Sequence, residues 1–228
     1  HAQLSTKSKL FCSDSTQFGA SPNSQVSAVS LAHPGTLPVL NSNAIDLAVK
    51  LGIVLNCEIE HYNYFARKNY FYPDLPKGYQ ISQYEEPICE FGFVEIESDD
   101  GVKKKIGLTR IHMEEDAGKS MHDIDAFDTL IDLNRAGTPL LEIVTEPDFS
   151  GGEDVYVYLN EVRKLVRYLD ICDGNMEEGS LRCDANISVM KKDATEYGKK
   201  VEVKNMNSFR NVQRAIDFEI KRQIDLIE

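Results

Sequence analysis

Residues 181–189 alternate strictly between apolar and polar side chains, and this stretch most constrains what the chain can fold into. The apolar positions are Leu181, Cys183, Ala185, Ile187 and Val189, and the polar ones are Arg182, Asp184, Asn186 and Ser188. A period of two predicts a β-strand with one face packed on a second layer. Asp and Asn are poor strand formers, so the polar face favours a functional surface. An ordinary amphipathic strand is the alternative.

Other stretches show the same alternation. Residues 93–97 and the stretch that begins at Lys103 carry opposite charges on either side of Asp99, Asp100 and Gly101, which predicts a β-hairpin. The returning strand ends in an acidic cluster at 114–116, turning from apolar to polar as it leaves the core. Residues 139–146 and 201–204 are expected to form further strands.

Helical periodicity follows three candidate caps. Asn43 is expected to cap a helix with apolar positions between 44 and 55. Ser150 and Glu153 form a capping box before an apolar stripe that ends at residue 169. Asn207 or Ser208 caps a last helix up to residue 227. Hairpin-connected strands with three helices between them predict an α+β fold with a largely antiparallel sheet and packed helices.

Length and composition are those of a globular domain. The 228 residues suffice for one large domain or two small ones, and no apolar run approaches the roughly 20 residues that span a bilayer. Five cysteines without a framework spacing indicate reduced thiols and a cytoplasmic location. The net charge is −12 and the sequence contains no basic stripe, so we do not expect the chain to bind nucleic acid by phosphate neutralisation alone. Because the chain begins at His1 without Met, we expect a fragment.

The acidic strands carry the candidate chemistry. If these strands are adjacent, their acidic side chains converge with several basic ones: Glu114, Glu115, Glu142, Glu178 and Asp184 with His1, His112, Arg182 and Lys204. Oxygen ligands of this kind select Mg²⁺ or Mn²⁺ over zinc. A carboxylate such as Glu142, between Leu140 and Val144, needs a salt bridge, hydrogen bonds or a cation if it is buried.

These residues by themselves leave the reaction open. Carboxylates, a divalent metal and basic side chains on a sheet suit phosphoryl transfer, and they suit a metal-dependent nuclease equally well. The glycine-rich phosphate loop of P-loop enzymes does not occur in the sequence, which argues against that class.

Four long motifs carry a family resemblance. They are residues 67–83 (RKNYFYPDLPKGYQISQ), 112–118 (HMEEDAG), 134–144 (NRAGTPLLEIV) and 176–186 (MEEGSLRCDAN). The chain resembles the B subunit of the aspartyl/glutamyl-tRNA amidotransferases over essentially its whole length. The resemblance implies a glutamine-synthetase-like catalytic domain that uses ATP and Mg²⁺ to phosphorylate the side-chain carboxylate of Glu-tRNA(Gln) or Asp-tRNA(Asn). Ammonia from the amidase partner, the A subunit, then displaces the phosphate, and a small C subunit belongs to the same complex.

The resemblance also implies roles for individual residues. His1, Glu115 and Glu142 match the main Mg²⁺ ligands. Glu114 and Asp184 would complete a second metal site or contact the nucleotide phosphates. Lys68 and Lys77 match lysines along the ammonia channel. From the residues themselves we add Arg182 and Lys204 as phosphate partners, so that the expected catalytic set is Glu115, Glu142, Asp184, Arg182 and Lys204.

Two departures from the family pattern limit what is carried over. The family's glutamate two positions before His1 is missing, and its zinc site of two Cys pairs corresponds here to Cys12, Asp14, Ser27 and Ser30, so no zinc is expected. We expect a single catalytic domain over 1–228, truncated at both ends, with the helical and tail domains that grip tRNA lying beyond Glu228. No membrane contact is expected. A non-catalytic scaffold fragment that only docks its partner is the rival interpretation.

Overall fold

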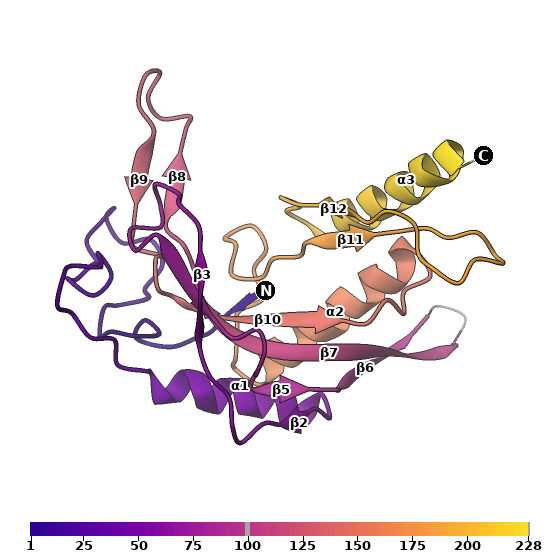
Figure 1. Ribbon diagram of the computed structural model, residues 1–228, viewed down its shortest axis with the longest axis horizontal. Helices are drawn as coiled ribbons and strands as arrows, with labels where there is room; N and C mark the ends of the chain where they lie inside the picture. The colour runs from indigo at the N-terminus through magenta and orange to yellow at the C-terminus, as the bar shows by residue number, and fades with distance from the viewer. Residues whose placement is uncertain (99–100, 228) are drawn as a thin grey trace.

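The computed structural model describes residues 1–98 and 101–227, and an antiparallel sheet forms its centre (Figure 1). The three helices of these residues are α1 (Ser42–Val54), α2 (Gly152–Tyr168) and α3 (Phe209–Ile227). The strands are β1 (Ala2–Gln3), β2 (Glu58–Ile59), β3 (Ala66–Asn69), β4 (Tyr79–Ser82), β5 (Cys89–Glu90), β6 (Phe93–Glu97), β7 (Lys103–Glu115), β8 (Lys119–Met121), β9 (Leu130–Asp132), β10 (Pro139–Thr145), β11 (Ala185–Ile187) and β12 (Val201–Val203). The predicted α+β class with a largely antiparallel sheet is confirmed.

Strand β7 is the central and longest strand of the main sheet. Antiparallel β10 pairs along one side of it, while β6, β5 and β4 pair in succession along the other. The predicted β6–β7 hairpin is confirmed, with Glu95 opposite Lys105 and Glu97 opposite Lys103. The Asp99 and Asp100 positions of its expected turn lie outside the described residues.

The buried face of β7 changes sides along the strand. Ile106 and Leu108 are buried in its first half, whereas Ile111 and Met113 are buried in its second. The face that carries Ile106 and Leu108 continues with the polar residues His112 and Glu114, which are also buried. The last five residues of β7 are therefore all buried. The expectation that the strand leaves the core here is wrong, because both faces of its last five residues, Glu114 and Glu115 included, are buried.

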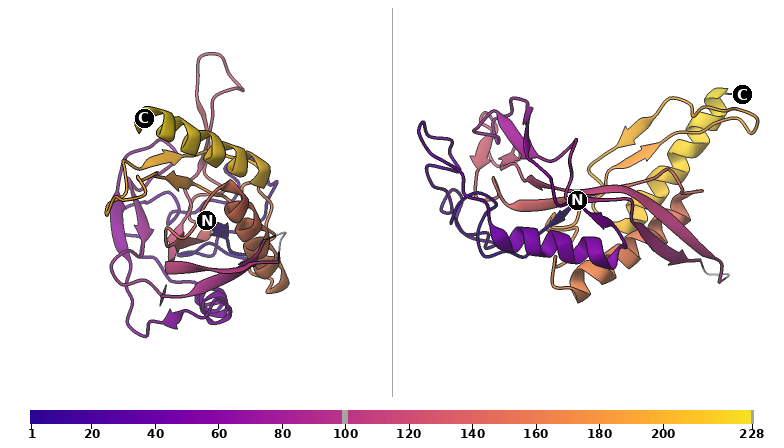
Figure 2. Two further views of the ribbon diagram at one scale, coloured as in Figure 1. Left: turned by 90° about the vertical axis from the view of Figure 1, so that its right-hand side faces the viewer. Right: turned by 60° about the horizontal axis from the view of Figure 1, so that its bottom comes forward.

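The helices cover this sheet from different sides. Figure 2 shows α3 (yellow) and α1 (purple) on opposite sides of the molecule. Helices α2 and α3 pack on each other, and α3 also contacts β11. Buried side chains of all three helices join one core with those of β7 and β10. No helix of the described ranges is long and apolar enough to cross a membrane.

Two of the three predicted caps are wrong. Helix α1 is capped by Asn41, whose side chain accepts a hydrogen bond from the Asn43 N–H. The cap of α2 is Gly151, without a side-chain cap; instead the Gly152 N–H donates to Asp217 on α3. Ser208 does cap α3, since its hydroxyl accepts from the Asn211 N–H at 3.2 Å.

The strand predicted over 181–189 is shorter than expected. Only Ala185–Ile187 forms a ladder, with β12, while Leu181 makes a single bridge to Ala2 in β1. The segment thus passes from one sheet to another, and the ladder is interrupted over 182–184. The alternation itself is correct: Leu181, Ala185 and Ile187 are buried.

Candidate metal centre

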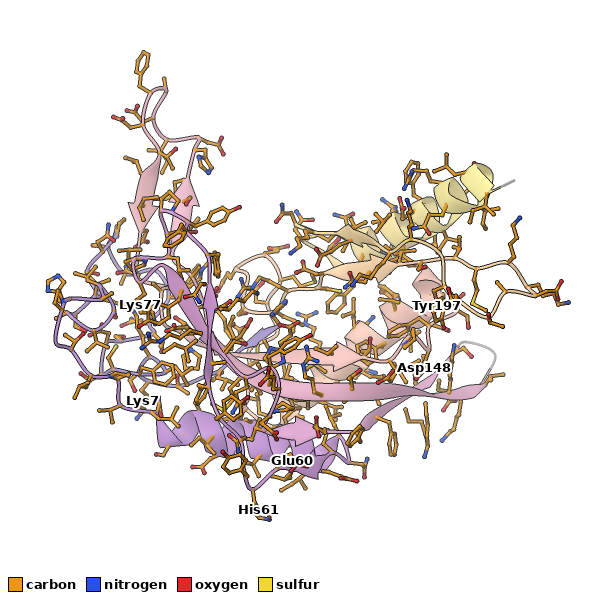
Figure 3. All side chains as sticks on the ribbon, viewed as in Figure 1. Lys7, Glu60, His61, Lys77, Asp148 and Tyr197 are labelled. Atoms are coloured by element: carbon orange, nitrogen blue, oxygen red, sulfur yellow. The ribbon has the colours of Figure 1, made fainter. Side chains whose placement is uncertain are left out.

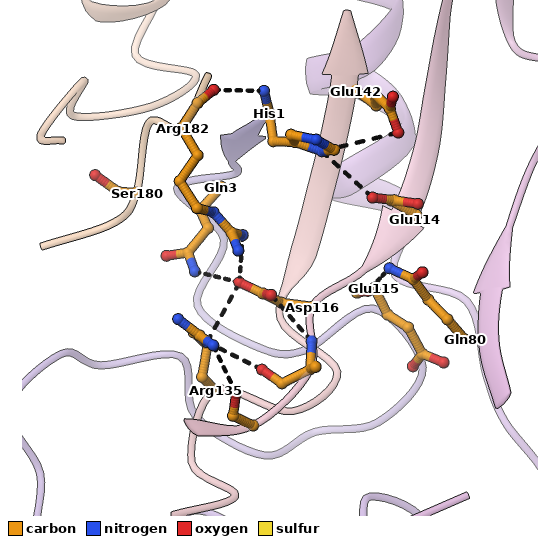
Figure 4. A network of polar contacts seen from close by, with 12 residues as sticks. His1, Gln3, Gln80, Glu114, Glu115, Asp116, Arg135, Glu142, Ser180 and Arg182 are labelled. Atoms are coloured by element: carbon orange, nitrogen blue, oxygen red, sulfur yellow. Dashed lines mark hydrogen bonds and ion pairs between the residues drawn. The ribbon is translucent and has the colours of Figure 1, made fainter. Parts of the chain in front are cut away.

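His1, Glu114 and Glu142 form the best-grouped set of potential metal ligands in the described residues. His1 precedes β1, Glu114 lies near the end of β7, and Glu142 lies in the middle of β10 (Figure 4). The register pairs Leu140 with Glu114 and Glu142 with His112, so both carboxylates lie on one face of the sheet. One ligand atom from each of the three lies within 4.8 Å of the others. His1 Nδ1 is 3.4 Å from Glu114 Oε1 and 3.8 Å from Glu142 Oε2.

Two further residues surround this group. His112 Nε2 lies 3.3 Å from Glu142 Oε2 and 3.9 Å from Glu114 Oε2. Asp184 Oδ2 lies 3.6 Å from His1 Nε2 on the other side of the imidazole. His112 is absent from the predicted ligand set, although its position two residues before Glu114 on the same strand face could have identified it.

Electrostatics favour the charged forms of His1 and Glu142. Burial alone would lower the pKa of His1, but hydrogen bonds to Asp184 and Glu114 and the charges of Glu142 and Glu114 raise it to about 10. Burial would raise the pKa of Glu142, yet its hydrogen bond to His112 and the charges of His1, His112 and Lys68 lower it to about 2. The positive charge of His1 and the negative charge of Glu142 therefore stabilise each other. Two carboxylates and an imidazole fit a hard divalent cation, which would require His1 to lose its proton.

Glu115 does not lie with this group. As the neighbour of Glu114 in β7, it points to the opposite face, where it forms an ion pair with Lys77 and accepts from the Ile81 N–H at 3.0 Å. Its backbone carbonyl accepts from Gln80 Nε2 at 2.7 Å (Figure 4). The expectation that groups Glu115 with His1 and Glu142 is thus corrected by the geometry: Glu114 occupies that place.

The two lysines expected along a channel lie in different surroundings. Lys68 is on the exposed edge strand β3, and its charge reaches Glu142. Lys77 lies near the β3 and β8–β9 end of the molecule, at the opposite end from Tyr197 (Figure 3). Together with Glu115, Lys77 lines a cavity of about 20 Å³, whose wall also contains Lys9 and Cys12.

The basic residues expected to contact phosphate are near the group. Lys204 Nζ lies 3.9 Å from Asp184 Oδ2 and 3.4 Å from Glu202 Oε2. Arg182 donates from Nη2 to Asp116 Oδ2 at 2.6 Å, and its backbone pairs with that of His1. Glu178, expected to converge with these residues, is exposed and outside the group. Asp116 was missed as a functional candidate, although it directly follows the two glutamates.

The four positions that correspond to a zinc site are linked by hydrogen bonds. The Asp14 carboxylate accepts from the Ser27 N–H at 2.8 Å and from the Ser30 hydroxyl. Cys12 Sγ lies 3.5 Å from the same hydroxyl. These contacts link the Cys12 and Asp14 segment directly to the segment that carries Ser27 and Ser30. The expected lack of zinc stays a prediction.

Comparison with known proteins gives matches over the full chain. The family model described as the GatB/GatE catalytic domain matches residues 1–228. The B subunits of the aspartyl/glutamyl-tRNA(Asn/Gln) amidotransferases from Thermodesulfovibrio yellowstonii, Thioalkalivibrio sulfidiphilus and Chlorobaculum tepidum are 58%, 59% and 60% identical to it over 228 residues. Each alignment covers 100% of this chain and 48% of the relative. The chain therefore spans about half the length of these relatives.

Proposed function

Because the chain belongs to the GatB/GatE catalytic-domain family, we propose that it is the catalytic portion of an amidotransferase B subunit that converts Glu-tRNA(Gln) or Asp-tRNA(Asn) to the amide. The observation that carries this proposal is the grouping of His1, Glu114 and Glu142 within 4.8 Å, beside Arg182 and Lys204. An ionised carboxylate group flanked by cations suits ATP-dependent phosphorylation of a carboxylate.

The reaction has two steps. A carboxylate is a poor electrophile, so an oxygen of the aminoacyl side chain attacks the γ-phosphorus of ATP and ADP leaves. Ammonia then attacks the acyl carbon, the carbon–oxygen bond to phosphate breaks, and phosphate leaves with the electron pair while the nitrogen loses a proton. The products are the amide, ADP and phosphate. Positioning and charge neutralisation supply most of the rate enhancement in such transfers.

His1, Glu114 and Glu142 are the residues that would hold Mg²⁺, with Asp184 adjoining them. When bound, the ion supplies charge neutralisation at the phosphate oxygens. In this proposal Arg182 and Lys204 contact phosphate. Since the Glu115 carboxylate faces Lys77 instead of His1, we assign Glu115 with Lys77 and Lys68 to the passage of ammonia.

The remaining proposals concern the whole protein. Ammonia comes from glutamine hydrolysed by an amidase partner, the A subunit, in a complex that includes a small C subunit. We propose that residues 1–228 are one catalytic domain with a glutamine-synthetase-like fold, working in the cytoplasm. Misacylated tRNA is gripped mainly by the part of the B subunit that lies outside the matched half. The acidic charge of −12 supports this division.

The test is Glu142→Gln in the full complex, with Glu146→Gln as its control. Gln keeps the shape and removes the charge at the metal centre, whereas Glu146 is exposed and directly follows the same strand. We expect Glu142→Gln to lower tRNA-dependent ATP hydrolysis and amide formation about a thousandfold, while basal glutamine hydrolysis by the partner persists. Mn²⁺ binding, measured by calorimetry, should weaken in parallel.

Glu146→Gln should match the wild type in both assays. The scaffold interpretation expects unchanged ATP turnover in both variants. A Glu142→Gln complex that assembles and phosphorylates Glu-tRNA at a near wild-type rate would refute the proposed role of this centre.

A further inference from the structure

Asp116 is a buried carboxylate on which three polar side chains converge. It follows β7 directly and is 3% exposed. Its Oδ2 accepts from Gln3 Nε2 at 2.7 Å and Arg182 Nη2 at 2.6 Å, and Arg135 Nε lies 3.5 Å away (Figure 4). Its Oδ1 accepts from the N–H of Ala117 at 3.0 Å. One oxygen thus bears all three of the side-chain contacts, two of them cationic.

The contacts of Asp116 tie together the two chain segments that carry the metal centre. The His1 and Arg182 backbones exchange hydrogen bonds of 2.9 Å, and the Gln3 N–H donates to the Ser180 carbonyl at 2.8 Å. Gln3 and Arg182 therefore flank the single bridge between Ala2 and Leu181, and their side chains end on the same carboxylate. A shift of Asp116 would move the Arg182 guanidinium relative to His1.

The two arginines use their donors differently. Arg135 donates from Nε to the Ala117 carbonyl at 3.0 Å and from Nη2 to the Gly118 carbonyl at 2.5 Å, so its guanidinium anchors the turn after β7. Arg182 uses only Nη2 for Asp116, and its Nε is buried without a hydrogen-bond acceptor among the described residues. With its side chain 33% exposed, Arg182 keeps donors that the protein does not use.

The charges around Asp116 also favour an anionic ligand at Arg182. One arginine would neutralise Asp116, but two are present, so the group of Asp116, Arg135 and Arg182 keeps one net positive charge. That charge adjoins the metal centre, since the backbone of Arg182 is hydrogen-bonded to that of His1 at 2.9 Å. Buried carboxylates are normally paired to balance their charge, and an additional cation with spare donors suits an anionic ligand.

We propose that Asp116 is a positioning residue that holds Arg182 beside the metal centre, where the solvent-accessible N–H groups of the Arg182 guanidinium bind a phosphate group of the nucleotide. Asp116 itself touches no substrate and acts through the guanidinium. This inference rests on the proposed function, because it takes ATP to be the substrate of the site.

The experiment is a double-mutant cycle in the full complex, with Asp116→Asn, Arg182→Ala and the combination of the two. ATP affinity in the presence of Mg²⁺, Mn²⁺ affinity without nucleotide, and the melting temperature are measured for each. Arg222→Ala is the matched control, because it removes an arginine from the ion pair with Glu219 on α3. Asp116→Glu, which keeps the charge and displaces the carboxylate, provides a second variant if Asp116→Asn does not fold.

We expect Arg182→Ala to weaken ATP binding by about 10- to 100-fold and Asp116→Asn by about 10-fold, with the double variant no weaker than Arg182→Ala. Mn²⁺ affinity should stay within about twofold of the wild type, as should ATP affinity in Arg222→Ala. Asp116→Glu should weaken ATP binding less than Asp116→Asn does.

Three results would overturn the inference: unchanged ATP affinity in Arg182→Ala, effects of the two substitutions that multiply in the double variant, or Mn²⁺ affinity that falls together with ATP affinity in Asp116→Asn. The last would mean that Asp116 only supports the metal centre. These outcomes are distinct from a failure of the proposed function, which would appear as normal ATP turnover in Glu142→Gln.

Discussion

Gly52 is buried in α1 where the helix packs on β5. Whether Gly52→Ala stabilises or destabilises the protein depends on how tightly this contact is packed. Helix propensity alone predicts that Ala at an interior helix position stabilises by up to about 1 kcal/mol. A Cβ at residue 52, however, would lie 2.5 Å from Cys89 Sγ and 2.7 Å from Ile59 Cδ1. Both distances are far below ordinary van der Waals contact, so neighbouring atoms must move.

The neighbours have little freedom to move. Cys89 is fully buried, and β5 is held between β2 and β7, with Ile59 and Ile111 as its register partners. Overpacking of this kind costs about 1–3 kcal/mol, so the net loss after the propensity gain is about 0–2 kcal/mol. For a chain of this size, that corresponds to a melting temperature lower by up to about 8 °C.

The assay is urea unfolding of Gly52→Ala, Cys89→Ala and the double variant. Removing the sulfur relieves the closest contact, so we expect a favourable coupling of about 1 kcal/mol in the double variant. Gly151→Ala is the control for added volume, since a Cβ there meets nothing within 4 Å; because Gly151 is the cap of α2, its effect should stay within about 1 kcal/mol and should not change when Cys89 is replaced. A Gly52→Ala protein more stable than the wild type would refute the packing argument.

Three other predictions concern charge and metal. Burial would raise the pKa of Asp154, but hydrogen bonds from Lys104 Nζ at 2.7 Å and the Ser150 N–H at 2.8 Å lower it. Its stabilisation is therefore present above the unfolded-state pKa of about 3.9 and lost as pH falls through the folded-state value. Asp154→Asn should cost about 1 kcal/mol at pH 7 by urea unfolding, and a gap from the wild type that stays constant below about pH 4 would contradict this reasoning. Metal analysis of the purified protein should find no stoichiometric zinc, because Cys12 alone cannot supply the ligands of a structural site; one zinc per chain would overturn this. In a gel-shift assay residues 1–228 should bind tRNA poorly because their charge is −12, and tight, salt-sensitive binding would count against it.

Local patterns in the sequence determined several features. The charge alternation of 93–97 and 103–105 was sufficient to predict the β6–β7 hairpin, because cross-strand pairs are neighbours once a tight connection is assumed. Ser208 was among the two cap candidates for α3, since a cap satisfies donors only a few residues away. The long motifs were sufficient to identify the family, which the match over 1–228 shows.

Distant contacts decided the remaining features. The period of two in β7 requires Glu114 and Glu115 to face opposite sides, but only the register with β10 and the approach of His1 determine that Glu114 joins Glu142. At the start of α2 the Gly152 N–H donates to Asp217, 65 residues further along the chain, which no local signal at Ser150 could indicate. Asp116 becomes a candidate only because Gln3 and Arg182, which lie far apart in the chain, meet on it. Such contacts depend on how strands and helices pack across long sequence separations, and residue spacing carries information only about neighbours along the chain.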